Sequence, residues 1–122
     1  MTYCILLVED EGLIRTTIAE TLEDAGYVVV SVATGDAACT LMNDSNGFDV
    51  LLTDIQMPGK ADGIDVARSF HERHPDGPVV FMTGRPEMLM RMGTLSCREK
   101  LLRKPFGSAQ MLHAIESLLI RT

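Results

Sequence analysis

Residues 48–58 read Phe-Asp-Val-Leu-Leu-Thr-Asp-Ile-Gln-Met-Pro, an apolar run that ends in an aspartate and a proline-containing turn. Its first part, Phe48–Thr53, is mostly apolar and has the length of a β-strand. The dipeptide Asn46-Gly47 directly before it is a turn signal, so a strand is predicted to follow. The strand runs into an ionisable residue, Asp54. A strand that ends in polar, chemically active residues is a pattern that three of the other four predicted strands repeat.

Apolar runs alternate with segments of helical spacing on both sides of this stretch. Further strands are predicted over Cys4–Val8, Tyr27–Val32, Pro78–Met82 and Lys100–Arg103. Four helices are predicted from apolar residues at helical spacing. The first has Leu13, Ile14, Ile18, Leu22 and Ala25 and stops at Gly26, and the second follows Thr34 and has Ala37, Ala38, Leu41 and Met42. The third has Ile64, Ala67 and Phe70 and ends before Pro75, and the last has Met111, Leu112, Ile115, Leu118 and Leu119. A further short helix is predicted over Pro86–Met92. Five strands alternating with five helices predict an α/β fold, a doubly wound five-stranded parallel sheet in a (βα)5 flavodoxin-like sandwich.

Length and composition place the chain among ordinary globular domains. The 122 residues fit one domain, predicted over 1–122, and 46% of them are hydrophobic against 23% charged. The formal net charge is −6, whereas a nucleic-acid-binding module needs a basic surface to meet phosphates. Tryptophan is absent and aromatic residues make up 5%, which also disfavours stacking on bases. We therefore expect no direct nucleic acid binding.

The cysteines and the N-terminus point to the cytoplasm. The cysteines stand at 4, 39 and 97, an odd number without the spacing of a zinc or redox motif. Cys4 and Cys39 lie among apolar or small residues and are interpreted as reduced packing residues. The N-terminus has no basic segment before its short apolar run, and no apolar run reaches the ~18 residues of a membrane span. We expect a cytoplasmic protein without a membrane segment.

Functional groups follow four of the five predicted strands. In an open parallel sheet, ligands bind beyond the carboxyl ends of the strands, so these groups are predicted to meet. They are Glu9, Asp10 and Glu11 after the first strand, Asp54 after the third, Thr83-Gly84 after the fourth and Lys104-Pro105 after the fifth. Two like charges ~4 Å apart repel by about 4 kcal/mol at an effective dielectric of ~20. A divalent cation removes this repulsion, and carboxylate oxygens suit Mg²⁺.

The set matches what a phosphoryl group requires. A metal and Lys104 would neutralise its charge, Thr83 would donate a hydrogen bond, and a carboxylate would act as nucleophile. Each residue taken alone has a plainer interpretation. Glu9 and Asp10 could cap the following helix, Asp54 could be a turn aspartate, and Lys104 could be a surface lysine. The convergence of four strand ends favours the functional interpretation.

The residues just named resemble a known family. The chain is similar, in order and along almost its whole length, to the receiver domain of two-component response regulators. The blocks that carry the resemblance are Val8-Glu9-Asp10-Glu11, Thr53-Asp54-Ile55-Gln56-Met57-Pro58, Asp62-Gly63, Thr83-Gly84 and Lys104-Pro105-Phe106. Any one block would be weak, and five together make the resemblance specific.

The resemblance implies a role for each matching residue. Asp54 would be the phosphoacceptor, taking a phosphoryl group from a sensor histidine kinase or a histidine phosphotransfer protein. Mg²⁺ would be held by four groups: Glu9, Asp10, Asp54 and the backbone carbonyl of Gln56. Thr83 would move inward to bond the phosphoryl oxygen, and Lys104, with a cis bond to Pro105, would pair with it. The domain would catalyse its own phosphorylation and dephosphorylation without acting as an enzyme on other substrates.

The sequence departs from the family pattern at three places. Glu9-Asp10 replaces the more common pair of aspartates, and Gly59-Lys60-Ala61 is one residue longer than the usual loop before Asp62-Gly63. Lys60 in this loop could contact a partner, but we favour solvation. Leu101 stands where a switch aromatic is usual, three residues before Lys104. Phe81-Met82-Thr83-Gly84 also resembles the Phe-Ala-Thr-Gly receiver subgroup, which lacks this aromatic.

Residues 85–94 contain three methionines, Met88, Met90 and Met92, at a spacing of two. In a helix they cannot share one face, so we expect part of this adaptable segment to be exposed. Two of them packing on the sheet with one idle on the surface is the plainer alternative. We favour a partner surface formed by this segment, the fifth strand with Leu101, and the final helix.

The three histidines are not assigned to chemistry. His71 and His74 precede Pro75 at a helix end and have no further metal ligand nearby, and His113 is interpreted as structural or solvent-facing.

The predicted function is that of a stand-alone receiver, a monomer or weak dimer that switches protein–protein interactions or relays or drains phosphoryl groups. A piece of a longer protein is the alternative for the chain as a whole. Two functional rivals remain: a Mg²⁺-dependent phosphohydrolase, for which Gln56 occupies the place of a second acid, and a binding module that is never phosphorylated.

Overall fold

The computed structural model describes residues 2–44, 47–85, 87 and 93–120. The five strands are β1 (Cys4–Val8), β2 (Val28–Val32), β3 (Val50–Asp54), β4 (Val79–Thr83) and β5 (Glu99–Arg103). The helices in the described residues are α1 (Gly12–Asp24), α2 (Gly35–Asp44), α3 (Gly63–Arg73) and α4 (Ser108–Leu119). The α/β prediction is confirmed. The short helix expected over Pro86–Met92 falls almost entirely outside the described residues.

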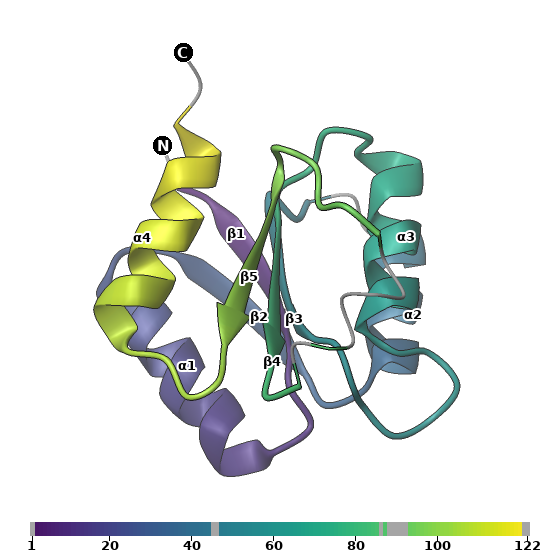
Figure 1. The fold of residues 1–122 in the computed structure, drawn as a ribbon, viewed down its shortest axis with the longest axis horizontal. Coiled ribbons are helices and arrows are strands. Elements are labelled where there is room, and N and C mark those ends of the chain that lie inside the picture. Colours follow the sequence, from purple (N-terminus) through teal and green to yellow (C-terminus); the bar gives the residue numbers. More distant parts are fainter. Residues whose placement is uncertain (1, 45–46, 86, 88–92, 121–122) are drawn as a thin grey trace.

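The strands form one parallel sheet in the order β2-β1-β3-β4-β5. Helices α1 and α4 cover one face and α2 and α3 cover the other, as Figure 1 shows. The chain passes from β1 to β2 on one side and then returns to β3 on the other side of β1. Such a reversal opens a crevice at the carboxyl ends of the two strands that flank it, here β1 and β3.

The core lies in two layers, one on each face of the sheet. Strands β3 and β4 are buried along their full length because they occupy the middle of the sheet and are covered on both sides. Alternate residues of each strand therefore enter opposite layers: Leu52 and Val80 pack towards α1 and α4, while Leu51 and Phe81 pack towards α2 and α3. This packing fixes the strand ends, and with them the groups that follow.

Helix boundaries follow local signals. Helix α1 ends at Asp24, and Gly26 (φ 99°) takes the left-handed conformation as predicted for a helix stop. Thr34 accepts a hydrogen bond from the Ala37 amide at 3.0 Å and so caps α2. Asp62 begins α3 through a reciprocal capping box with Asp65. The predicted third strand began at Phe48, whereas β3 begins at Val50. Asp49, just before it, is already bonded to Cys4, since its amide donates to the Cys4 carbonyl and its carboxylate accepts from the Cys4 amide, each at 2.8 Å.

Candidate phosphoryl-transfer site

The buried polar residues of the described chain gather at one edge of the sheet. They are Glu9, Thr53, Asp54 and Thr83, and they lie at the ends of β1, β3 and β4. Glu9 is 0% exposed and Asp54 is 3% exposed, although each carries a carboxyl group. Buried carboxyl groups are rare unless they are paired. Their place at the β1/β3 reversal matches the expected ligand crevice.

Lys104 is the partner of both buried carboxyl groups. Its Nζ lies 2.9 Å from Glu9 Oε1 and 2.7 Å from Asp54 Oδ1. Lys104 follows β5 directly, and its peptide bond to Pro105 is cis, as predicted. Glu9 Oε2 also accepts the Glu11 amide at 3.1 Å. The structure thus brings together three of the groups expected at the strand ends.

Burial and mutual repulsion shift the ionisation of this triad. Burial and the adjacent Glu9 raise the pKa of Asp54 to about 8, against the opposing effect of Lys104. Burial alone would raise the pKa of Glu9, but its hydrogen bonds with Asp54 and Lys104 outweigh burial and lower it. Burial likewise opposes the charged form of Lys104, and bonds to Asp54 and Glu9 raise its pKa nonetheless. Without a bound cation, these opposite shifts favour the retention of one proton by the carboxyl pair near neutral pH, more on Asp54 than on Glu9.

The acidic residues fit a hard divalent cation. Glu9, Asp10 and Asp54 each offer a carboxylate oxygen, and these atoms all lie within 4.8 Å of one another. Asp10 is exposed, so the cluster opens to solvent on one side. Three carboxylates with room for water form a donor set typical of Mg²⁺. Gln56 lies two residues beyond Asp54 with an exposed side chain, at the start of the loop between β3 and α3.

Thr83 ends β4, and its hydroxyl is bonded to the following loop. The hydroxyl donates to the Arg85 carbonyl at 3.1 Å and accepts from the Arg85 amide at 2.9 Å. The structure therefore places Thr83 at the expected sheet edge, with its hydroxyl bonded to the backbone of Arg85. No sequence pattern indicates this local bond, which is the turn that a serine or threonine hydroxyl forms with the backbone two residues ahead.

Arg15 is a further residue that the sequence analysis missed. It lies in the first turn of α1, and its Nη1 donates to the Glu9 carbonyl at 2.9 Å. The guanidinium thereby ties the helix to the loop that carries Glu9 and Asp10. Nothing in the sequence pattern distinguishes Arg15 from a solvated helical arginine.

Of the residues predicted to form a switch or partner surface, the structure describes Leu101 but not the three methionines. Leu101 is half-buried, packs against the core layer under α2 and α3, and lies opposite Phe81 in register. Its side chain therefore serves as core packing at the place of the usual aromatic. Met88, Met90 and Met92 lie outside the described residues, so the Met-rich surface stays a prediction.

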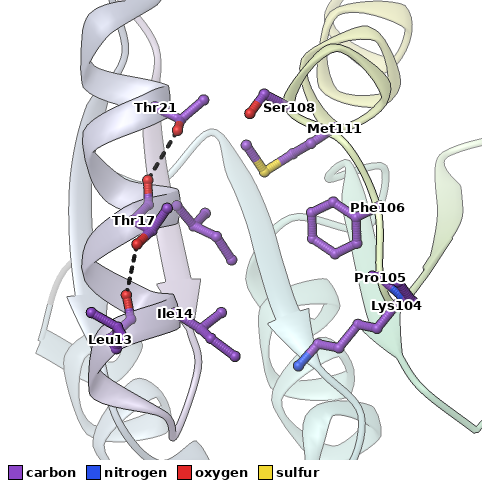
Figure 2. A pocket seen from close by; sticks show the side chains of 10 residues that line it. Leu13, Ile14, Thr17, Thr21, Lys104, Pro105, Phe106, Ser108 and Met111 are labelled. Carbon is purple, nitrogen blue, oxygen red and sulfur yellow. Dashed lines mark hydrogen bonds between the residues drawn. The ribbon is translucent and has the colours of Figure 1, made fainter.

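An apolar groove of about 610 Å³ opens between α1 and the segment that joins β5 to α4 (Figure 2). Leu13, Ile14, Phe106 and Met111 are among the residues that line it. The hydroxyls of the two groove threonines point along the helix, since Thr17 donates to the Leu13 carbonyl at 2.9 Å and Thr21 to the Thr17 carbonyl at 3.0 Å. The groove wall is consequently apolar, and Lys104 lines one end of it.

Leu13 corrects one expectation. Its helical spacing placed it in the buried stripe of α1, yet it is 83% exposed. Leu13 lies in the first turn of α1, at the rim of the groove, where the described residues do not cover it. Periodicity identifies the face of a helix but not where the covering layer ends.

Comparison with known proteins agrees with this geometry. Residues 5–116 match the family model of the response regulator receiver domain. The response regulator receiver protein CpdR of Brucella abortus is 37% identical over 117 residues, which cover 95% of this chain and 96% of that protein. The sensor kinase CckA of the same organism is 31% identical over 117 residues, covering 94% of this chain and 12% of the kinase. A crystal structure of a receiver protein from Sinorhizobium medicae superposes with a TM-score of 0.89, at 32% identity, covering 97% of this chain and 94% of that one.

The chain belongs to the response regulator receiver domain family, the phosphoacceptor family of two-component systems. Its fold is that of the receiver structures. Among the described residues, no helix is both long enough and apolar enough to cross a membrane. No comparison tests the proposed Phe-Ala-Thr-Gly subgroup, which stays a prediction.

Proposed function

We propose that Asp54 accepts a phosphoryl group from a phosphohistidine and that Mg²⁺ is required for the transfer. One observation carries the proposal: Asp54 is buried at the end of the central strand β3, 2.7 Å from Lys104 and in one cluster with Glu9 and Asp10. A purely structural aspartate gains nothing from being crowded against two further carboxylates. The same arrangement favours an incoming cation and a phosphoryl group.

In the proposed step, a carboxylate oxygen of Asp54 attacks the phosphorus atom. The new O–P bond forms as the N–P bond to the donor histidine breaks, and the imidazole nitrogen keeps the electron pair of that bond. Hydrolysis reverses the modification when a water oxygen attacks the same phosphorus, which releases inorganic phosphate and returns the carboxylate. The attack requires ionised Asp54, and the raised pKa of this carboxyl group opposes ionisation until a cation is bound.

Mg²⁺ would be held by Glu9, Asp10, Asp54 and the backbone carbonyl of Gln56, and it would neutralise charge on the transferring group. Lys104 would exchange its contact with Asp54 for a phosphoryl oxygen while remaining anchored by Glu9. Thr83 would give up its bonds to Arg85 and donate its hydroxyl to another phosphoryl oxygen. Each of these residues stabilises charge that grows during transfer.

The proposed donor is a sensor histidine kinase or a histidine phosphotransfer protein. The apolar groove beside α1 supports a helical donor surface, because Lys104 lines both the groove and the site. A helix whose apolar face fills the groove would bring a histidine on that helix towards Asp54. Leu13, 83% exposed at the rim, would be an anchor of this contact.

The groove can be tested with two matched surface variants. We expect Leu13→Asp to slow phosphoryl transfer from a phosphorylated histidine protein about tenfold or more, since anchor residues typically contribute over 1 kcal/mol. Phosphorylation by acetyl phosphate should be unchanged, because this donor needs no groove. Ile120→Asp is the control, as Ile120 is 69% exposed at the far end of α4. Equal transfer rates for the two variants would count against the groove.

The acceptor site is tested by NMR of backbone amides with Mg²⁺ and then beryllofluoride, a phosphoryl mimic. We expect Mg²⁺ to shift resonances around Asp10 and Asp54, and beryllofluoride to add shifts at Thr83 and Lys104. Asp54→Ala should abolish the beryllofluoride response. Asp44→Ala, which removes an exposed acid at the end of α2, should leave it intact.

The outcomes separate the rival functions. A folded protein that binds Mg²⁺ but ignores beryllofluoride would be a binding module rather than a phosphoacceptor. Turnover of generic phosphate esters would favour a phosphohydrolase. Beryllofluoride shifts that extend to Leu101 and residues 88–92 would support the proposed partner surface there, where output would be a change in protein–protein binding.

A further inference from the structure

The loop between β3 and α3 is closed at its neck. It leaves Asp54 and returns at Gly63, whose amide donates to the Ile55 carbonyl at 2.8 Å. Gly63 itself packs so closely on the Asp54 carbonyl oxygen that any side chain there would overlap it. The two ends of the loop are therefore fixed directly behind the proposed phosphoacceptor.

The tip of this loop, residues 59–61, is docked on the start of α2. Gly35, the first residue of α2, touches the Ala61 backbone so closely that an added Cβ would overlap the Ala61 carbonyl oxygen. The Asp36 carboxylate lies over the tip, with Oδ2 3.4 Å from the Lys60 amide nitrogen. A Cβ on Gly59 would lie only 2.9 Å from the same oxygen. The lengthened part of the loop is thus held rather than free.

Between its neck and its tip, the loop has a third contact with the rest of the domain, made by Met57. Met57 is partly buried and packs against the core layer under α2 and α3. Gln56 therefore stands between two fixed points, the β3 strand end and Met57. A shift of the loop tip or a loss of the Met57 packing would therefore be expected to move the backbone of Gln56.

We infer that Asp36 on α2 is a positioning residue for the proposed Mg²⁺ site. It binds the loop tip and so holds in place the loop that carries Gln56, whose carbonyl is proposed as a metal ligand. Mg²⁺ then binds to a loop that is already ordered, and no binding free energy is lost in ordering it. The inference rests on the proposed function, since it assigns Asp36 a part in that same site. Asp36 itself contacts neither metal nor phosphoryl group in this arrangement.

A simpler effect of Asp36 must be separated from this one. A carboxylate near a cation site also attracts the cation through its charge, whether or not it holds the loop. Asp36→Asn removes the charge but keeps an oxygen that accepts the Lys60 amide, whereas Asp36→Ala removes both. Asp44→Ala removes the same charge from the other end of the helix.

The experiment is a Mg²⁺ titration of the full chain by calorimetry, repeated for the three variants. We expect Asp36→Ala to raise the Kd for Mg²⁺ about 3- to 10-fold, the range that corresponds to one hydrogen bond of ordinary strength. Asp36→Asn should stay within about twofold of the wild type, and so should Asp44→Ala. In Asp36→Ala, hydrogen exchange of the Lys60 amide should also accelerate, since that amide loses its acceptor.

Three results would overturn the inference. Equal weakening by Asp36→Asn and Asp36→Ala would mean that the charge acts and the loop anchor does not. An unchanged Kd in Asp36→Ala with normal Mg²⁺ binding by the wild type would remove Asp36 from the site while leaving the proposed function standing. A wild type that binds no Mg²⁺ would remove both.

Gly35→Ala approaches the same contact from its other side. The added methyl must push the Ala61 backbone away, yet alanine favours the helix conformation of α2 more than glycine does. We expect weaker Mg²⁺ binding together with shifted amide resonances in residues 56–61. Shifted resonances with an unchanged Kd would show that the loop tip and the metal site are independent, and would overturn the inference.

Discussion

Lys104 Nζ lies 2.7 Å from the Asp54 carboxylate in a site where a second carboxylate, Glu9, holds the same amine at 2.9 Å. One cation therefore neutralises two buried acids that are 95 and 50 residues distant from it in sequence. Because one positive charge cannot fully balance two negative ones, the fully ionised site has a net negative charge. This charge favours the binding of a proton in the cation-free protein and the binding of a metal ion when one is present.

The shared proton makes the stability of the cation-free protein depend on pH. The pKa of Asp54 is raised to about 8, so folded protein keeps a proton that the unfolded chain releases near pH 4. Its contribution is complete below about pH 4 and is lost as the pH rises towards 8. The lowered pKa of Glu9 acts only below its ordinary value of 4.5, and the raised pKa of Lys104 only above 10.5, so neither interferes in this window.

We therefore expect the free energy of unfolding to fall by ~1–3 kcal/mol between pH 5 and 8 in the presence of a chelator. Asp54→Asn should flatten this dependence and stabilise the protein at pH 8, since it removes the group that must ionise. Urea unfolding at several pH values measures both. A wild-type profile that is flat or rises across this window would contradict the raised pKa.

Loss of Lys104 should be costly for the opposite reason. In Lys104→Met, the two buried carboxyl groups lose their cation, and we expect a destabilisation of ~2 kcal/mol at pH 8. The loss should shrink at pH 5, where a proton can replace the amine, and also in saturating Mg²⁺. Lys60→Met is the matched control, because it removes an equal charge from an exposed loop position and should stay within about 0.5 kcal/mol. Equal losses for the two variants would show that the ion pairs contribute nothing.

Much of the site followed from the sequence by one geometric rule. Parallel strands present their carboxyl ends at one edge, so groups after β1, β3, β4 and β5 had to converge, and Glu9, Asp54, Thr83 and Lys104 do. The strand boundaries agreed to within one or two residues because buried strands are continuous apolar runs. These features depend on local pattern and topology alone.

The remaining features depend on contacts that no local pattern encodes. Leu13 belongs to the apolar stripe of α1, but its exposure is decided by where α4 and its preceding loop begin. The docking of Ala61 on Gly35 depends on two loops distant in sequence meeting at one helix end. The role of Arg15 depends on the hydrogen bond that its side chain donates to the Glu9 carbonyl, which the sequence pattern does not indicate.

The engagement of Thr83 with Arg85 predicts how a signal leaves the site without a switch aromatic. If Thr83 turns to a phosphoryl oxygen, the Arg85 amide and carbonyl lose their 2.9 and 3.1 Å partners, and the backbone at Arg85 is freed from Thr83. We expect beryllofluoride to shift the Arg85 amide strongly in the wild type and in Thr83→Ser. In Thr83→Ala this shift should be absent although Asp54 still binds the mimic. A full Arg85 response in Thr83→Ala would require a different route.

Gly63 allows a test of whether its close contact with the Asp54 backbone holds Asp54 in position. Any Cβ at this position overlaps the carbonyl oxygen of Asp54, and both residues are buried. We expect Gly63→Ala to lower the free energy of unfolding by ~3 kcal/mol, the upper range for overpacking, and to weaken beryllofluoride binding because Asp54 is displaced. Gly107→Ala is the control, since Gly107 is the N-cap of α4 and has no atom within 4 Å of an added Cβ. Because alanine is a poorer N-cap than glycine, it should lower the free energy of unfolding by about 1 kcal/mol at most and leave the site intact. If both variants bind the mimic as the wild type does, the position of Asp54 does not depend on the close contact behind it.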